Sequence, residues 1–481
     1  MWDNLWPKLG GGLVFAGLFA SWSACSQGGF IADSGKMASQ EDGGTDGLLI
    51  ESVSPARGPS TGGIKVLLRG RRFDSGSSVS FAGVDSPLVS LSGEDELTAT
   101  LPPSPGKLGL VDVKVRRPDG KEALRSDLFA YYPGQLSFGA PRNFTVDSKP
   151  SRLALGDLNG DSKLDLVVAS RSSGSLSILN GKGDGTFDAY RRVGIAGSPS
   201  AVLLSEMTSD QALDVMVACD GSGSSLFLLT GKGDGTLQSP RAVFNVSSAV
   251  MAGGDYNSDG KYDVAIPYFA FAANGIGFLF GKGDGTFTNA GSQGLPSGSF
   301  GISSADFNAD GKADLAVTLY DDSTIAIMQN LGSRFQILRY VSAGAGPHGV
   351  VAADFNGDSK ADLVVSDPDG GALRVMLGKG DGTFQPAVVL PTGGATPQPV
   401  LAVDLNLDGI LDLVTVNVGS MGTVTVMLGT GGGQFAQPLQ VAAAGSHSDV
   451  VATDVNGDRL PDLIVPVSSG SSVSVLLNTS R

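Results

Sequence analysis

Residues 157–168 read Asp157-Leu-Asn-Gly-Asp-Ser-Lys-Leu-Asp165-Leu-Val-Val168, a polar stretch followed at once by an apolar run. Oxygen-bearing side chains occupy its positions 1, 3, 5 and 9, and the apolar run is typical of a short buried strand. The pattern returns with first positions at Asp255, Asp306, Asp354, Asp404 and Asp454. An altered copy fills the one gap in the series, with Glu206, Thr208, Asp210 and Asp214. The steps between first positions are 49, 49, 51, 48, 50 and 50 residues, so one unit repeats seven times.

Each unit holds four candidate strands, which in the first unit are residues 152–155, 166–169, 176–179 and 187–191. The polar loop joins the first two strands, and a Gly-Lys-Gly-Asp-Gly-Thr turn at 181–186 joins the last two. Four-stranded units at this period predict a β-propeller. The last unit stops before its fourth strand, and Leu136–Phe138 precedes the first unit at the matching position. We therefore expect residues 136–481 to form a seven-bladed β-propeller that an N-terminal strand closes.

A different pattern precedes the repeats. Residues 49–133 alternate apolar and polar positions in several short runs separated by Gly and Pro, which predicts a small antiparallel β-sandwich. The fold class is therefore all-β, with this sandwich ahead of the propeller.

The acidic charge of the chain is concentrated in the repeated loops. The formal net charge is -15, yet the six complete loops hold 18 of the 48 acidic residues, and the other 30 face 33 Lys and Arg. The acidic residues are therefore concentrated in the loops, where a cation would bind. The sequence has no cluster of basic residues with interleaved aromatics, so it does not indicate nucleic acid as a partner.

The loops carry the ligand type that calcium prefers. Asp and Asn oxygens at positions 1, 3, 5 and 9, with a backbone carbonyl at position 7, suit Ca²⁺ better than Mg²⁺. The acid at position 9 and the strand after it exclude an EF-hand, and a single such loop could equally be a solvated Asx-turn. The sequence predicts about six structural Ca²⁺ sites, while the altered copy is expected to bind weakly or not at all. The expected ligands are Asp157, Asn159, Asp161, Lys163, Asp165, Asp255, Asn257, Asp259, Lys261, Asp263, Asp306, Asn308, Asp310, Lys312, Asp314, Asp354, Asn356, Asp358, Lys360, Asp362, Asp404, Asn406, Asp408, Ile410, Asp412, Asp454, Asn456, Asp458, Leu460 and Asp462.

Two families share these motifs. The loops resemble the calcium-binding hairpin loops of FG-GAP/VCBS propellers, as in the heads of integrin α-subunits, and Phe138-Gly-Ala-Pro141 matches the name of the repeat. Residues 52–73, Ser80–Gly83 and Thr98–Pro103 resemble the TIG/IPT family of immunoglobulin-like domains, which serve mostly as spacers or protein contacts. The resemblance implies that the loops are structural and that a ligand binds on the opposite face of the propeller.

The N-terminus has the features of an export signal. An apolar stretch from Leu9 to Ala20, too short to span a bilayer, precedes Ser23, Ala24 and Cys25. This arrangement resembles a bacterial lipoprotein signal, which implies a signal peptide at 1–24 and a lipid on Cys25. Residues 25–48 are expected to be a flexible tether. We expect an exported lipoprotein at the outer membrane or cell surface, with secretion as the alternative.

Residues of the second-to-third-strand loops and of the connections between units are the candidates for the ligand face: Tyr268, Phe269, Phe271, Tyr320, Asp321, His348 and His447. The favoured function is a calcium-stabilised, membrane-tethered binding or adhesion protein without catalytic activity, whose partner is a protein or a glycan at the cell surface. A carbohydrate-binding propeller is the first alternative, and a surface hydrolase or lyase is a weaker one. The chain has only two His and no G-x-S-x-G, H-E-x-x-H or Walker motif, which disfavours an enzyme.

Overall fold

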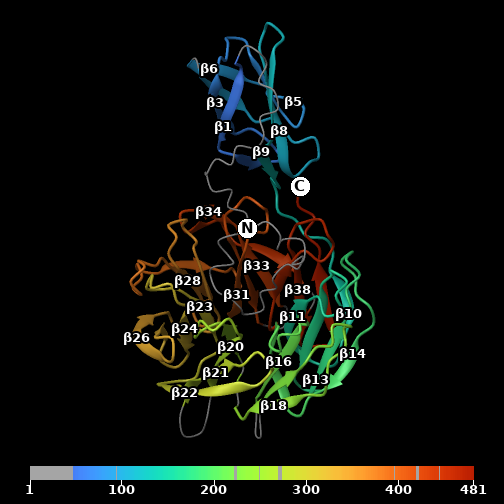
Figure 1. Ribbon diagram of the computed structural model, residues 1–481, viewed down its shortest axis with the longest axis vertical. Coiled ribbons are helices and arrows are strands. Elements are labelled where there is room, and N and C mark those ends of the chain that lie inside the picture. The colour runs from blue at the N-terminus through green and yellow to red at the C-terminus, as the bar shows by residue number, and fades with distance from the viewer. Residues whose placement is uncertain are drawn as a thin grey trace. The chain divides into compact units, whose positions relative to one another are not determined.

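The fold is all-β in the computed structural model, which describes residues 47–481 except 94, 221–224, 247, 249, 269–273, 395, 419–421 and 444. No helix occurs among these residues, and hence none that could cross a membrane (Figure 1). The expected signal peptide, Cys25, and most of the tether lie outside the described residues, as do Phe269 and Phe271. Two compact units are present: Gly139–Val403 with Ile410–Leu477, and the described residues up to Phe138 with Asp404–Gly409 and Asn478–Arg481.

The residues up to Tyr132 form the expected sandwich of two sheets. One sheet has the order β1 (Leu49–Ser54), β3 (Lys65–Arg71), β7 (Glu96–Thr100), β6 (Val89–Gly93). The other has the order β2 (Arg57–Pro59), β9 (Glu122–Tyr132), β8 (Gly109–Arg116), β4 (Ser78–Phe81), β5 (Val84–Asp85). Alternate residues of each strand point inward, and the core holds Phe129 in edge-to-face contact with Phe81 and Tyr131.

The repeats form seven four-stranded antiparallel sheets, which we call blades 1 to 7 (Figure 1). Blades 1 to 4 are β11 (Pro150–Gly156), β12 (Asp165–Ser170), β13 (Ser175–Leu179), β14 (Arg191–Gly194); β15 (Ser198–Ser205), β16 (Asp214–Asp220), β17 (Leu226–Leu229), β18 (Arg241–Phe244); β19 (Ala252–Gly254), β20 (Asp263–Tyr268), β21 (Asn274–Gly281), β22 (Phe287–Leu295); and β23 (Ile302–Ala305), β24 (Asp314–Leu319), β25 (Thr324–Asn330), β26 (Phe335–Ser342). Blades 5 to 7 are β27 (Val350–Ala353), β28 (Asp362–Asp367), β29 (Ala372–Met376), β30 (Val388–Pro391); β31 (Pro397–Val403), β32 (Asp412–Asn417), β33 (Thr423–Met427), β36 (Leu439–Ala442); and β37 (Val451–Thr453), β38 (Asp462–Val467), β39 (Ser472–Leu476), β10 (Arg142–Thr145). A short hairpin of β34 (Gly429–Gly431) and β35 (Gln434–Phe435) precedes the fourth strand of blade 6.

An N-terminal strand completes the last blade, as expected, but not at the expected residues. The strand is β10, which pairs with β39 from Arg142↔Val475 to Thr145↔Ser472, whereas Phe138 makes only an isolated bridge with Asn478. The fourth strand of blade 1 is displaced in the same way, from 187–191 to β14. A proline directly before or two residues before the strand, such as Pro141 or Pro240, lacks an N–H donor and interrupts the ladder in several blades. Blades 3 and 4 have no proline there, and β22 and β26 run unbroken from the turn; blade 1 also has no proline there, so proline does not account for the late start of β14 at Arg191.

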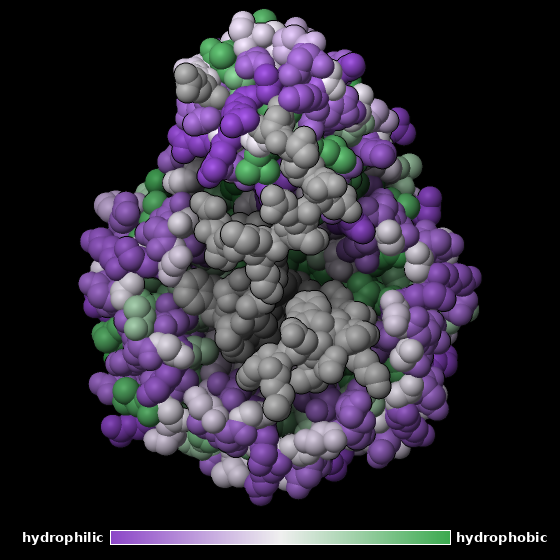
Figure 2. All heavy atoms as spheres, turned by 45° about the horizontal axis from the view of Figure 1, so that its top comes forward, coloured by the Kyte–Doolittle hydropathy of each residue, from purple (hydrophilic) through white to green (hydrophobic). Residues whose placement is uncertain are grey.

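The hydrophobic core of the repeat region lies between neighbouring blades. The second strands are buried along all or nearly all of their length, and residues such as Val167 and Ile178 of blade 1 pack with Val202 and Val217 of blade 2. The fourth strands are largely exposed. Figure 2 shows hydrophilic residues over most of the surface in view, with hydrophobic residues scattered singly, as is usual for a protein surface.

Candidate functional site

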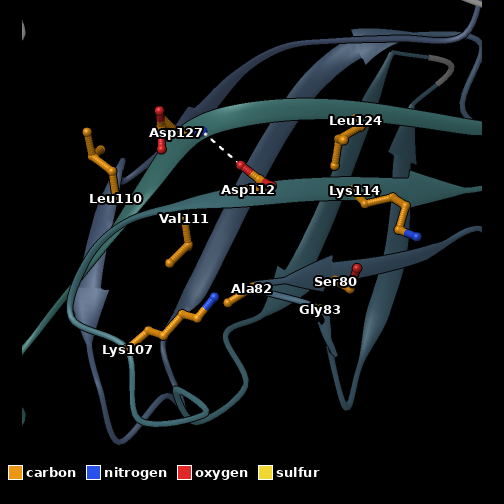
Figure 3. A pocket seen from close by; sticks show the side chains of 10 residues that line it. All are labelled: Ser80, Ala82, Gly83, Lys107, Leu110, Val111, Asp112, Lys114, Leu124 and Asp127. Carbon is orange, nitrogen blue, oxygen red and sulfur yellow. Dashed lines mark hydrogen bonds between the residues drawn. The ribbon is translucent and has the colours of Figure 1, made fainter.

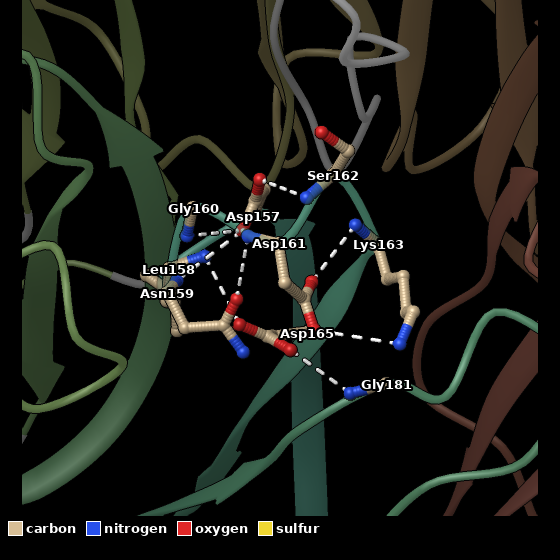
Figure 4. A network of polar contacts seen from close by, with 9 residues as sticks. All are labelled: Asp157, Leu158, Asn159, Gly160, Asp161, Ser162, Lys163, Asp165 and Gly181. Carbon is tan, nitrogen blue, oxygen red and sulfur yellow. Dashed lines mark hydrogen bonds and ion pairs between the residues drawn. The ribbon is translucent and has the colours of Figure 1, made fainter.

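The loop at 157–165 is ordered by its own carboxylates (Figure 4). Asp157 Oδ1 accepts hydrogen bonds from the backbone N–H groups of Gly160 at 2.7 Å and Asp161 at 3.2 Å, and its Oδ2 accepts one from Ser162 at 2.7 Å. Asn159 Oδ1 accepts from Asp161 N at 2.9 Å. The side chains at positions 1 and 3 therefore fold the loop, and Ser162 takes a positive φ of 64°.

The same geometry recurs in the other five complete loops. In each, Oδ2 of the first Asp accepts from the N–H at position 6, at 2.7–2.8 Å, and position 6 has a positive φ. The position 6 donors are Gly260, Gly311, Ser359, Gly409 and Arg459. The Asx-turn and the arrangement of acceptors are thus built into the sequence of every complete loop.

The aspartate at position 9 connects two parts of its blade. It is fully buried in all seven copies, including Asp214 of the altered loop. Asp165 Oδ2 accepts from Leu158 N at 3.0 Å and Oδ1 from Gly181 N at 2.9 Å, so it joins the start of the loop to the end of the third strand. Asp214 does the same with Met207 N and Gly231 N, both at 2.9 Å. We call this group the position 9 clamp; its members are Asp165, Asp214, Asp263, Asp314, Asp362, Asp412 and Asp462.

Burial shifts the titration of these carboxyls. Burial and the neighbouring Asp310 and Asp306 carboxylates raise the pKa of Asp314 to about 7. Burial raises the pKa of Asp263 to about 6 and that of Asp362 to about 6. The backbone N–H bonds act in the opposite direction, but desolvation of the charged form is the larger effect.

The loops also connect neighbouring blades. The carbonyl at position 2 of each loop accepts a hydrogen bond from the next blade, as when Gly235 N donates to Leu158 O at 2.9 Å. In blades where the glycine turn is lost, an asparagine side chain replaces it: Asn330 Nδ2 donates to Tyr256 O and Asn478 Nδ2 to Leu405 O, both at 2.8 Å. The remaining pairs are Gly185 with Val455, Gly285 with Met207, Gly382 with Phe307 and Gly433 with Phe355. Each loop is therefore a junction between two blades, a role that the repeated glycine turns could have indicated.

The donor set of the complete loops fits a hard cation in chemical type. Positions 1 and 5 offer carboxylates and position 3 an amide oxygen, on a largely exposed loop. The position 7 lysine Nζ lies 3.7 Å from the position 5 carboxylate in blade 1 and 3.5 Å in blade 5, and such exposed ion pairs contribute little. Among the described residues, no group of three or more His, Cys, Asp or Glu side chains is already assembled as a metal centre. Both oxygens of the position 9 clamp already accept backbone hydrogen bonds, so its first role is to hold the blade together.

A pocket of about 600 Å³ lies at the other end of the blades. Its walls are Tyr320 and Asp321 of a second-to-third-strand loop, Asn274 and Gln398 at the starts of β21 and β31, and residues of the connections between blades (Gly298, Phe300, His348). The metal-type loops join first to second strands, so the pocket is on the opposite face of the propeller. The Phe300 and His348 rings are stacked, with centroids 4.9 Å apart and planes 8° apart, and Tyr320 meets Phe300 edge-to-face at 5.5 Å. Burial lowers the pKa of His348 to about 4, so its ring is neutral at pH 7.

The ligand-face residues expected from sequence are only partly brought together. Tyr320, Asp321 and His348 line the pocket, whereas Tyr268 packs into the core cluster between blades 2 and 3. His447 is fully buried, with its Nδ1 3.1 Å from Pro466 O, so it cannot contact a ligand at the surface. Phe300 and Asn274 were missed, because no repeat pattern distinguishes them.

A second pocket, of about 540 Å³, lies on the outer face of the sandwich domain (Figure 3). The exposed side chains of Leu110 and Leu124 flank it, together with Asp112, whose Oδ1 accepts from Asp127 N at 3.3 Å. Lys114 Nζ lies 3.4 Å from Glu122. Several of its polar groups thus already have partners, unlike those of the propeller pocket.

Comparisons with known proteins agree with this architecture. The FG-GAP-like repeat model matches residues 255–317, 306–365, 354–415 and 404–465, the FG-GAP repeat model matches 150–187, and the IPT/TIG domain model matches 48–132. No curated protein sequence matches the chain.

Similar solved structures share little sequence with the chain. An auxiliary nutrient binding protein from Bacteroides ovatus is 13% identical, with 91% of this chain and 99% of that chain covered and a TM-score of 0.40. The WD40 domain of Toxoplasma gondii coronin is 12% identical, with 72% and 86% covered and a TM-score of 0.49. The Dos1 propeller is 11% identical, with 89% and 95% covered and a TM-score of 0.45. With the repeat and domain models matched in sequence and the repeated four-stranded sheets in the structure, the chain belongs to the FG-GAP repeat β-propeller proteins and carries an IPT/TIG domain ahead of its repeats.

Proposed function

We propose that this protein is a calcium-stabilised binding protein of the cell surface, without catalytic activity, that holds its ligand on the propeller face opposite the metal-type loops. The observation that carries the proposal is the propeller pocket. Within the described residues, the side chains of Asn274, Tyr320, Asp321, His348 and Gln398 have no hydrogen-bond or ion-pair partner there. Polar groups that converge in a concave site beside aromatic rings are typical of ligand-binding pockets.

Calcium would have a structural role in this protein. Asp and Asn at positions 1, 3 and 5, with the position 7 carbonyl and the position 9 Asp, would hold the ion in the six complete loops. The ion would supply positive charge beside the position 1, 5 and 9 carboxylates and so relieve the repulsion that Asp306 and Asp310 exert on Asp314. Because each loop also joins two blades, ion binding there would stabilise the contacts between them.

The lack of catalysis is supported by the surroundings of the two histidines. His348 stacks on Phe300, and the Nδ1 of His447 lies beside a backbone carbonyl. Neither histidine, within the described part of the chain, is hydrogen-bonded to a nucleophile or to an acid that would orient it as a general base.

Membrane tethering through Cys25 is part of the same proposal. It is supported by the lipoprotein-like sequence around this residue. Replacing Cys25 with Ser should move the protein from the membrane to the soluble fraction and abolish metabolic labelling with a fatty acid. Labelling that persists in the variant would contradict lipidation at this residue.

The binding role is tested with labelled Cys25→Ser protein on intact cells. His348→Ala should weaken binding to the cells and lower the melting temperature only slightly, because it removes the stack on Phe300 but no hydrogen bond within the described residues. Tyr340→Phe, an exposed tyrosine on β26, is the control. Binding that His348→Ala leaves unchanged would contradict a ligand site on this face.

A further inference from the structure

The propeller pocket contains a stack of two rings. Phe300 and His348 lie with only 8° between their ring planes, so each ring covers one face of the other and leaves its outer face for other contacts. Tyr320 stands at 83° to Phe300 and forms a second wall. All three rings are half-buried, so part of each surface faces the pocket. A ligand with a flat, weakly polar face would bury that face here with a favourable free energy.

The other side chains that line the pocket offer both hydrogen-bond donors and hydrogen-bond acceptors. Asn274 and Gln398 each offer a donor and an acceptor, the Tyr320 hydroxyl offers both, and Asp321 offers acceptors. A purely apolar ligand would leave the half-buried Asn274, Gln398 and Tyr320 groups without partners, which is costly. The ligand therefore carries several groups that donate and accept at once, as hydroxyls do.

The charge of the pocket selects against ionic ligands. Its lining contains no Lys or Arg, and the Arg152 guanidinium, whose charge helps to lower the pKa of His348, already donates to Ser448 O; a phosphate, sulfate or carboxylate would therefore meet Asp321 without a cation in the lining. Asp321 is itself exposed, so an ion pair with a cationic side chain would be weak in water. The pocket volume of about 600 Å³ lies within the range of small-ligand sites, roughly 300–1,000 Å³.

From these features we infer that the pocket binds a neutral sugar, with a pyranose face packed on an outer face of the Phe300–His348 stack and its hydroxyls bonded to Gln398, Asn274, Tyr320 and Asp321. The inference rests on the proposed binding function and names its ligand class. The site lies where blades 3 to 6 meet.

The experiment uses the full chain with Cys25→Ser on an array of neutral, sialylated and sulfated glycans, followed by calorimetry with the best neutral glycan. Gln398→Ala and Tyr320→Phe should each weaken neutral-glycan binding roughly tenfold, the effect of one lost hydrogen bond. Gln336→Ala and Tyr340→Phe, on the exposed fourth strand of blade 4, are the matched controls and should leave affinity unchanged. All four variants should melt at the temperature of the parent protein.

The outcomes separate this inference from the proposed function. Binding to acidic glycans alone, or neutral-glycan binding that both pocket variants leave intact, overturns the inference. If no glycan binds but intact cells still bind in a manner that His348→Ala weakens, the sugar inference fails and the binding face stands. If neither glycans nor cells bind, both fail.

Discussion

The position 9 clamp gives the sharpest stability prediction, and blade 2 isolates it from calcium. Its altered loop is expected to bind calcium weakly or not at all, yet Asp214 keeps its bonds to Met207 N and Gly231 N. In Asp214→Ala both buried N–H groups lose their acceptor, at about 1–3 kcal/mol each, so unfolding free energy should fall by about 2–6 kcal/mol. Asp214→Asn keeps one acceptor and should cost about half as much.

Asp210 in the same loop is the matched control. Within the described residues, its Oδ1 accepts from Ala212 N alone, at the exposed end of the loop, where water can replace it. Asp210→Ala should therefore change stability by about 0.5 kcal/mol or less. Urea unfolding measures the total change in unfolding free energy. Because a ring of blades need not unfold in a two-state transition, hydrogen exchange of the Met207 and Gly231 amides is used to show that the loss occurs at these two bonds.

The same substitution in blade 1 separates the clamp from the cation. In EGTA, Asp165→Ala should lose nearly as much stability as Asp214→Ala, because the two aspartates accept equivalent backbone bonds and Asp214 accepts one more, from the Thr208 hydroxyl at 3.1 Å. In calcium, Asp165→Ala should lose more, since a ligand of the ion is also removed. Asp214→Ala as stable as Asp210→Ala would refute the clamp.

Two further predictions concern pH and the contacts between blades. In EGTA, the free energy of unfolding should fall as the pH rises from about 4 to about 7. In the folded protein the pKa is about 6 for Asp263, about 7 for Asp314 and about 6 for Asp362. In the unfolded chain the same carboxyls ionise near pH 4, so the folded state loses stability over this range. Saturating calcium should remove this fall, because the ion favours the ionised carboxylates, and a flat melting temperature in EGTA over this range would contradict the raised pKa values. Asn330→Ala should lower the unfolding free energy by about 1–3 kcal/mol, because the Asn330 amide donates to Tyr256 O and Ala313 O. Gln336→Ala in the same urea titration is the control. A loss for Asn330→Ala no larger than that of the control would show that this contact does not matter.

The sequence predicted the architecture well because the repeat is regular. The loop positions, the apolar second strands and the turn glycines recur at a fixed period, so one assignment extends to every unit. The closing strand and the fourth strand of blade 1 were wrong by a few residues, because where the ladder is interrupted depends on local pairing, which the apolar pattern does not report.

The site was less predictable because it is irregular. Asp165 was taken only as a metal ligand, since a sequence pattern does not show that its oxygens meet Leu158 N and Gly181 N. His447 and His348 look alike in sequence, both preceding innermost strands, yet one is buried and the other lines the pocket. Phe300 acquires significance only because the fold stacks it on His348.

The central claim, that the loops hold structural calcium, is tested most directly by the melting temperature of the full chain in excess calcium and in excess EGTA. Each site filled at a hundred times its dissociation constant adds about 2.7 kcal/mol, so several filled loops should raise the melting temperature by many degrees. Calorimetric titration of the metal-free protein should then count about six sites, the number of complete loops. A melting temperature that is the same in calcium and in EGTA would contradict the account.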